Sequence, residues 1–201
     1  MNKGLIALAI GALVTIGIAS TLIGGYNDAI SSEQSVIGQY KANENLLGQY
    51  TLQVMESMQV ADAYKDGVKD VVKAAIEGRY GPDGSKAVLQ FIKEQNPTLD
   101  PALYTNVQDI ITTKRNEFQH KQDELINRCQ VYQTTLRSFP SNLVLGLFNF
   151  PRMDDAPPAL KKELATGKER LDKICTPIVS AQARNAFDSG IDQGVQLHPG
   201  H

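Results

Sequence analysis

Residues 5–23 of this chain read LIALAIGALVTIGIASTLI. Only Thr15, Ser20 and Thr21 in this stretch carry polar side chains, and none of its residues is charged. Folded as an α-helix, a segment of this length extends roughly 28 Å, close to the ~30 Å thickness of the hydrocarbon core of a bilayer. The stretch therefore predicts a transmembrane helix, and we place a membrane anchor at residues 1–25.

A cleaved signal peptide is the alternative interpretation of the same residues. Lys3 would supply its positive end, residues 5–18 its apolar core, and Gly17-Ile18-Ala19 its cleavage site. We favour the retained anchor, because the apolar stretch is long enough to span a bilayer.

Four residues of the anchor are singled out: Leu5, Gly11, Gly17 and Ile23. Small residues recur along the span at intervals of four, a spacing that lets two transmembrane helices pack closely. Glycine is also common in such helices without any packing role. Both interpretations stay open.

The charges that flank the anchor predict its orientation. Lys3 and the α-amino group precede the apolar stretch, whereas Asp28 and Glu33 are the first charges after it. The positive-inside rule then places the N-terminus in the cytoplasm and the bulk of the chain outside. We expect a single-pass protein of a bacterial cell (inner) membrane with an extracytoplasmic, periplasmic domain.

Beyond the anchor, mostly apolar residues recur at alternating intervals of four and three. The positions are Tyr26, Ile30, Glu33, Ile37, Tyr40, Glu44, Leu47, Thr51, Val54, Met58 and Ala61. This is the heptad pattern of a helix with one buried seam. Because no proline occurs before Pro82, we expect the membrane helix to continue directly into this coiled-coil-like stalk.

Further helices are predicted over residues 60–78, 85–95 and 101–138, with Asp100 as the N-cap of the last. The expected fold class is all-α. An N-terminal transmembrane helix continues into a long-helix antiparallel bundle over residues 26–155. An extra C-terminal helical segment follows over residues 156–201.

Lys114, Lys121 and Arg128 lie seven residues apart on the predicted 101–138 helix. We expect their stems to lie along the edge of the core with their charges in water. The alternative is a basic strip that pairs with Glu33 and Glu44 of the first helix.

Residues 138–151 read SFPSNLVLGLFNFP and form an apolar turn in an otherwise polar-faced chain. The residues assigned to this structural turn are Phe139, Pro140, Asn142, Phe148 and Phe150. We predict that the three phenylalanines are buried at the end of the bundle. The alternative is a surface patch that meets lipid or a partner.

The longer stretch YQTTLRSFPSNLVLGLFNFPRMD, residues 132–154, resembles the LemA family, as does Tyr26-Asn27 just after the anchor. The similarity covers about residues 1–155. It implies a membrane-attached helical bundle, and it brings no catalytic residues. The chain lacks the Arg-rich stretch and proline that usually end the family's first helix, and residues 157–201 lie outside the pattern.

Composition argues against several functions. The net charge of −2 does not favour nucleic-acid binding, and tryptophan is absent. The three histidines occur in no metal or catalytic motif, and His198 and His201 at the C-terminus are too few to hold a metal. We predict no enzymatic activity, no cofactor and no metal.

Two function classes remain. The favoured one is a membrane-anchored, self-associating structural or scaffolding protein. The alternative is a regulatory adaptor for a membrane-associated partner such as a protease or a sensor kinase. The expected partners are the lipid bilayer, further copies of the chain and an unidentified membrane or envelope protein.

Cys129 and Cys175 are the only cysteines. A disulfide between them suits an extracytoplasmic domain. Both also lie on apolar helix faces, so two buried free thiols are the competing prediction.

Surplus apolar residues predict assembly. Val36, Leu46, Leu52 and Met55 lie beside the heptad seam, and residues 158–195 add another amphipathic face. We therefore predict a parallel homo-oligomer, ring-like or of higher order. In this arrangement residues 139–150 lie displaced from the anchor along the stalk.

Overall fold

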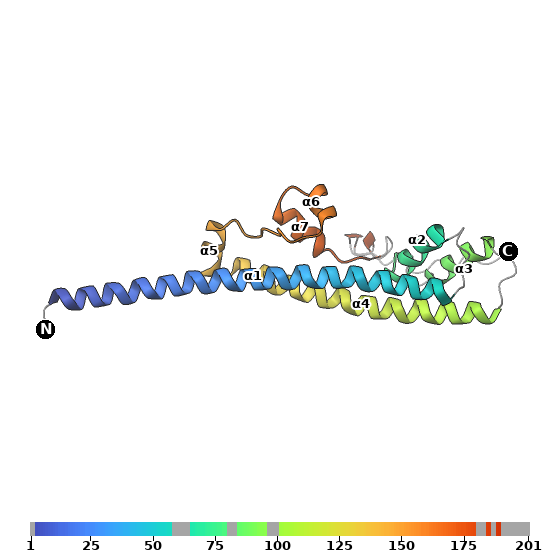
Figure 1. Cartoon of the computed structure of the whole chain (residues 1–201), viewed down its shortest axis with the longest axis horizontal. Helices are drawn as coiled ribbons and strands as arrows, with labels where there is room; N and C mark the ends of the chain where they lie inside the picture. Colours follow the sequence, from blue (N-terminus) through green and yellow to red (C-terminus); the bar gives the residue numbers. More distant parts are fainter. Residues whose placement is uncertain are drawn as a thin grey trace. The chain divides into compact units, whose positions relative to one another are not determined.

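The computed structural model describes residues 3–57, 65–79, 84–95, 101–179, 184–185 and 188–189. Regular structure in these ranges is helical, without strands, as the all-α expectation requires (Figure 1). Several predictions fall outside the described residues: those for Met58, Ala61, Asp100, His198 and His201.

Seven helices are described. They are α1 (Lys3–Ser57), α2 (Lys65–Ile76), α3 (Gly84–Gln95), α4 (Pro101–Arg137), α5 (Ser141–Leu147), α6 (Pro158–Glu163) and α7 (Gly167–Ile174). The helices predicted before residue 138 all form, and α4 ends one residue before the predicted limit. Helix cannot continue through Phe139-Pro140, because proline disfavours helical geometry in the residue before it.

α1 is one continuous helix of 55 residues that passes through Gly24-Gly25 without a break. Its two parts differ in burial. The described side chains between Leu5 and Ile23 are exposed, whereas from Ala29 onward every third or fourth residue is buried or half-buried. Among the described residues, α1 is the one helix long and apolar enough to cross a membrane.

The chain divides into two compact units, to both of which α1 and α4 contribute. Unit 1 comprises Met1–Lys41 and Glu124–Thr176, and unit 2 comprises Ala42–Asp123 and Pro177–His201. This division differs from the one drawn from sequence, which separated residues 156–201 from the bundle. Up to Thr176 those residues belong to the same unit as the anchor.

The core of unit 1 joins α1, α4, α6, α7 and the segment that follows α5. Its buried members are Val36, Ile37, Leu125, Cys129, Tyr132, Met153, Ala156, Leu160, Leu171 and Ile174. The C-terminal segment up to Ile174 thus packs into the core, and the apolar face of this part is not left over for assembly. The prediction of one amphipathic segment is corrected in another respect, because the chain breaks into α6 and α7 before Pro177.

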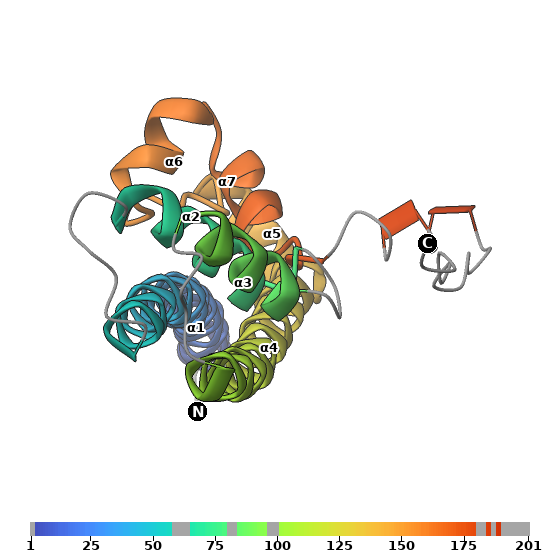
Figure 2. The same ribbon diagram turned by 90° about the vertical axis from the view of Figure 1, so that its right-hand side faces the viewer.

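The core of unit 2 is assembled from α2, α3 and parts of α1 and α4. Its buried members are Leu47, Val54, Met55, Val68, Val72, Ala75, Ile76, Val88, Leu89, Val107, Ile111 and Phe118. Figure 2 shows α2 and α3 lying over α1 and α4 in this unit. Val36 and Met55, expected to be surplus, are buried, while Leu52 is exposed.

Candidate functional site

The part of unit 1 around α5 and the apolar part of α1 carries several of the features that sequence analysis singled out. α5 lies beside the apolar part of α1. Together they line an open apolar hollow of about 420 Å³, whose lining is Val14, Gly17, Ile18, Thr21, Leu22, Pro140, Leu143 and Val144. The prediction that residues 139–150 lie displaced from the anchor is therefore wrong, because α5 turns back onto the anchor itself.

The prediction that the three phenylalanines are buried is also wrong for two of them. Phe139 is 79% exposed and Phe148 is 47% exposed, while Phe150 is half-buried. α5 has seven residues, about two turns, so it offers one narrow inward face, and Val144 and Leu145 occupy it. Phe139, Leu143, Leu147 and Phe148 are exposed, as the alternative of a surface patch expected.

The other residues of the structural turn, Pro140 and Asn142, lie at its start. Pro140 lines the apolar hollow, and Asn142 is exposed at the start of α5, where its N–H donates to the carbonyl of Ser138 at 2.8 Å. The peptide bonds Phe139-Pro140 and Phe150-Pro151 are cis.

An aromatic cluster lies where the segment after α5 meets α1. The ring of Tyr26 contacts the rings of Phe148 and Phe150 edge-on, with centroids 4.9 and 5.7 Å apart. The guanidinium of Arg152 lies 4.7 Å from the centroid of Phe150 and 5.8 Å from that of Tyr26. Such contacts stabilise the return of the chain to α1.

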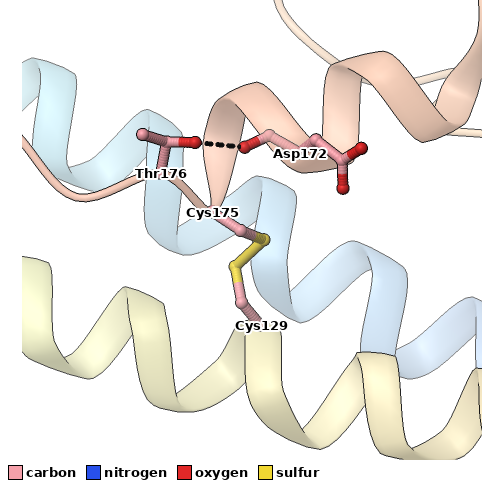
Figure 3. Close-up of a disulfide and its surroundings, with 4 residues drawn as sticks. All are labelled: Cys129, Asp172, Cys175 and Thr176. Atoms are coloured by element: carbon pink, nitrogen blue, oxygen red, sulfur yellow. Dashed lines mark hydrogen bonds between the residues drawn. A yellow bond between two sulfur atoms is a disulfide. The ribbon is translucent and has the colours of Figure 1, made fainter. Parts of the chain in front are cut away.

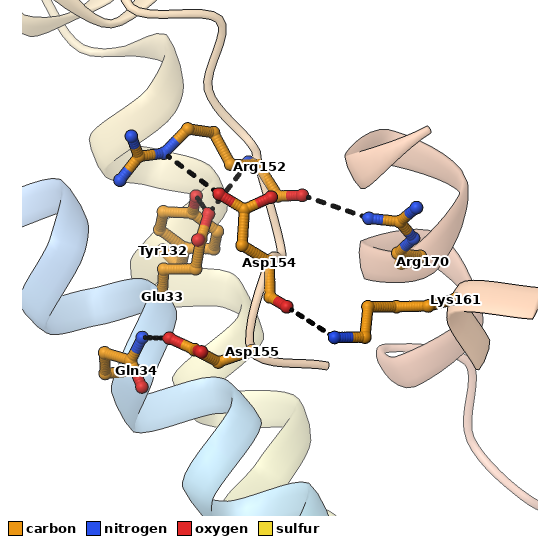
Figure 4. A network of polar contacts seen from close by, with 8 residues as sticks. All are labelled: Glu33, Gln34, Tyr132, Arg152, Asp154, Asp155, Lys161 and Arg170. Carbon is orange, nitrogen blue, oxygen red and sulfur yellow. Dashed lines mark hydrogen bonds and ion pairs between the residues drawn. The ribbon is translucent and has the colours of Figure 1, made fainter. Parts of the chain in front are cut away.

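A buried carboxylate lies just beyond the aromatic cluster. Glu33 is only 4% exposed, and it accepts hydrogen bonds from the hydroxyl of Tyr132 at 2.5 Å and from the backbone N–H of Arg152 at 3.0 Å (Figure 4). Burial, together with the hydrogen bond to Glu33, raises the pKa of Tyr132 far above its ordinary value. The carboxylate thereby joins α1, α4 and the segment after α5 at one point.

Arg128 and Lys114 of α4 bond to residues other than Glu33, in contrast to the alternative interpretation of a basic strip that pairs with it. Arg128 donates to Ser35 at 2.6 Å and to Glu124 at 2.8 Å, and Lys114 donates to Glu117 at 3.0 Å. Since Glu33 is already occupied by a tyrosine hydroxyl and a backbone N–H, its charge is met by hydrogen bonds.

Further polar contacts fix the segment between α5 and α7. Arg170 donates to the carbonyl of Arg152 at 3.5 Å, Lys161 donates to the carbonyl of Asp154 at 3.0 Å, and Gln34 donates to Asp155 at 2.5 Å (Figure 4). Asp154 and Asp155 thus belong to a structural network.

Gly167 at the start of α7 is required by close packing. A Cβ placed there would lie 2.1 Å from the carbonyl oxygen of Pro151, a distance that no side chain can occupy. α7 therefore approaches the segment after α5 as closely as backbone allows. The preceding Thr166 caps the helix, and Glu169 completes a reciprocal capping box.

Cys129 and Cys175 form a disulfide in the structure, with their Cα atoms 5.8 Å apart (Figure 3). The bond links α4 to the end of α7 across 46 positions of sequence. Beside it, the hydroxyl of Thr176 donates to the carbonyl of Asp172 at 2.7 Å. The disulfide thus fixes the C-terminal segment to the long helices.

A polar hollow of about 380 Å³ lies next along α1, on the C-terminal side of the apolar one. Its lining is Asp28 together with the hydroxyl side chains of Ser31, Ser32, Thr134, Thr135, Ser138 and Ser141. The surface beside α5 therefore changes from apolar to hydroxyl-rich just where the charged part of α1 begins.

The part of the chain that the structure describes offers few side chains that could bind a metal ion together. No group of three or more His, Cys, Asp or Glu side chains is gathered there. The arrangement supports packing, covalent linkage and contact with an apolar phase.

Sequence reasoning left open whether Cys129 and Cys175 form a disulfide or remain free thiols, and it missed the pairing of Glu33 with Tyr132. The available signal was a polar side chain within a mostly apolar seam on each long helix, Glu33 on α1 and Tyr132 on α4. The chain matches no family model, no curated protein and no solved structure.

Proposed function

We propose that the protein is a membrane-anchored structural or scaffolding protein that self-associates and holds a helical bundle outside the bilayer. The observation that carries this proposal is the contrast within α1. Its first part is apolar on all sides and exposed, while the rest of the same helix has one buried stripe. Exposed apolar side chains around a whole helix are stable in lipid and not in water.

The proposed bundle is a pair of long antiparallel helices. The support is the order of contacts between α1 and α4. In unit 1, Glu33 pairs with Tyr132 and Ser35 with Arg128, and in unit 2, Asn43 donates to the carbonyl of Lys121 at 3.0 Å. Within unit 1, contacts move back along α4 as they move forward along α1. This arrangement accords with the resemblance to the LemA family.

We propose the cell membrane as the location, with the N-terminus in the cytoplasm and the bundle on the extracytoplasmic side. Two features support this orientation: the positive charge before the anchor and the Cys129–Cys175 disulfide. Disulfides persist in the periplasm and rarely in the cytoplasm.

Self-association is proposed to be parallel, because the anchors confine all copies to one plane and one orientation. An exposed apolar residue outside the anchor, Leu52 on α1, offers a contact for it. Chemical cross-linking in membranes, followed by mass measurement in mild detergent, tests this part. Recovery of monomer alone would remove self-association from the proposal.

Anchoring itself is tested by extracting membranes that contain the full chain with alkaline carbonate, which releases peripheral proteins. The wild type should remain in the membrane pellet. Leu13→Asp together with Ile16→Asp places charge in the middle of the span and should release the protein. The matched control Leu52→Asp changes an exposed apolar residue of the same helix and should leave the protein in the pellet. Release of the wild type would reject the anchor.

A further inference from the structure

We infer that α5 is a second membrane-embedded element, a short re-entrant helix that enters the lipid beside the anchor and returns to the same side. The inference rests on the proposed membrane anchoring. It concerns the stretch 138–151, whose apolar outward face has no covering in unit 1 and whose occupant is taken to be the hydrocarbon of the bilayer.

The first argument is depth. The apolar hollow is lined by Val14 and Leu22 on α1 and by Pro140, Leu143 and Val144 from α5 and the residue before it. Val14 is the middle residue of the 5–23 span, and Leu22 is next to its end. α5 therefore lies alongside the second half of the span. If the span crosses the bilayer, α5 must lie within the leaflet on the side of the bundle.

The second argument is side-chain chemistry. The 138–151 stretch contains no charged residue, and Arg137 and Arg152 stand just outside it. Its outward side chains are as exposed as those of the anchor: Leu147 is 78% exposed, compared with 69% for Leu13. A patch of this kind that is continuous with a transmembrane surface is favourable in lipid and unfavourable in water.

The third argument concerns the backbone, because lipid offers no hydrogen bonds to unpaired N–H groups. Several N–H groups of this segment donate to carbonyls within it. Leu143 donates to Pro140 at 3.1 Å, Phe148 to Val144 at 3.3 Å, and Phe150 to Leu145 at 3.0 Å. Proline at position 140 has no N–H to satisfy. The segment can therefore enter an apolar phase without leaving these donors unpaired.

The fourth argument is the composition of the two ends. Ser138 and Ser141 line the hydroxyl-rich hollow with Asp28, where the segment would enter the leaflet. Tyr26, Phe150 and Arg152 cluster where it would leave. Hydroxyls, a tyrosine and an arginine are the residues expected at the boundary between headgroups and hydrocarbon. Both ends of the segment thus lie at one interface.

The absence of tryptophan allows a direct test with single-tryptophan variants of the full chain in lipid vesicles. Leu147→Trp reports on α5, and Leu13→Trp reports on the anchor. Val131→Trp is the control, because Val131 is 57% exposed on α4, beside Tyr132, which bonds Glu33 about ten residues beyond the span. Ten residues of helix correspond to ~15 Å above the hydrocarbon. The measurements are emission wavelength, quenching by phospholipids brominated on the acyl chain, and quenching by aqueous iodide.

We expect Leu147→Trp to lose emission in brominated lipid to the same extent as Leu13→Trp, with a shift to shorter wavelength and protection from iodide. Val131→Trp should respond to iodide alone. If Leu13→Trp is quenched by lipid while Leu147→Trp responds as Val131→Trp does, the re-entrant helix is rejected and the anchor stands. If neither is quenched by lipid, the proposed anchoring fails as well. Phe139→Trp, before the start of α5 and 79% exposed in the wild type, repeats the test should Leu147→Trp not fold.

Discussion

Each of the two units holds a tyrosine–glutamate pair between α1 and α4, with the roles exchanged. In unit 1 the glutamate, Glu33, is on α1 and Tyr132 is on α4, and both are buried. In unit 2 Tyr50 is on α1 and half-buried, and its partner Glu117 on α4 is exposed and also bonded to Lys114. The same chemical pair thus occurs in two environments.

The difference shows how burial decides what a polar pair contributes. A buried carboxylate that loses a donor keeps its desolvation cost, whereas an exposed one is rehydrated. Unit 1 accordingly depends on specific polar and covalent links. The hydrogen bonds of Glu33 and the Cys129–Cys175 disulfide connect the short C-terminal segments to the long helices. Unit 2 depends mainly on apolar contact between α2, α3 and the long helices.

The largest effect should follow removal of the disulfide. Cys129→Ser with Cys175→Ser opens a loop with a sequence separation of 46 and should destabilise unit 1 by about 4 kcal/mol in the chain-entropy model. Hydrogen exchange of the full chain in detergent, read by mass spectrometry, should show α7 losing protection while α2 and α3 keep theirs.

A reducing agent is the control for this prediction. It should reproduce the effect in the wild type and change nothing in the double variant. Equal loss of protection in both units, or no loss in either, would contradict the idea that unit 1 depends on its covalent link.

The second prediction tests directly whether the two tyrosine–glutamate pairs differ in what they contribute to stability. Tyr132→Phe removes one of the donors to a buried carboxylate and should cost about 1–3 kcal/mol of unfolding free energy. Tyr50→Phe makes the same chemical change beside an exposed carboxylate and should cost less than about 1 kcal/mol. Denaturant unfolding of each variant in the same detergent measures both values. Equal costs would mean that burial does not govern the pairs.

Much of this fold follows from the sequence because local rules govern long helices. The absence of proline before Pro82 predicted an uninterrupted α1, and Phe139-Pro140 predicted the end of α4. The apolar 5–23 stretch predicted a long apolar helix, and it forms the exposed part of α1. In these regions the hydrophobic period and the position of proline decide the outcome on their own.

The site was predictable only in part, since it depends on how distant segments meet. Apolar composition at Phe139 and Phe148 is the same whether the rings face protein or lipid, so sequence favoured burial where the structure has exposure. A glycine at position 167 does not by itself predict that α7 packs against the backbone of Pro151. The break between α6 and α7 was marked only by Thr166, which is an N-cap residue three positions before Glu169.

The third prediction concerns alkaline pH. Folding raises the pKa of Tyr132 above its ordinary value of 10.0, mainly through burial. Above pH 10 the unfolded chain therefore releases a proton that the folded chain keeps, so stability is present below pH 10 and falls as the pH rises beyond it. The loss approaches about 1.4 kcal/mol per pH unit.

Tyr132→Phe should remove the part of this slope that Tyr132 contributes, and a titration of unfolding free energy from pH 8 to 11 compares the variant with the wild type. Tyr50 has its pKa raised to about 12 by burial and by Glu117, so Tyr50→Phe should also flatten the profile. An unchanged slope in Tyr132→Phe would contradict the prediction.

The fourth prediction concerns the cap of α7. Thr166→Ala removes the side-chain oxygen that accepts the N–H of Glu169 at 3.2 Å and should cost about 1 kcal/mol. Thr112→Ala is the matched control, because the hydroxyl of Thr112 donates to a carbonyl within α4, at an exposed position of unit 2. Exchange of amides in α7 should rise in the first variant and stay constant in the second.

The smallest effect is expected at Phe148, where an enclosed ring was predicted from sequence. Phe148 is 47% exposed and contacts Tyr26 edge-on, so Phe148→Ala should cost only about 0.5 kcal/mol. The matched variant Phe118→Ala removes a ring that is fully enclosed in the core of unit 2, and it should cost about 3–5 kcal/mol. Denaturant unfolding in one detergent compares the two rings under equal conditions. A cost for Phe148→Ala as large as that for Phe118→Ala would show that the ring is enclosed by protein after all. The outward face of α5 would then not be free to meet lipid.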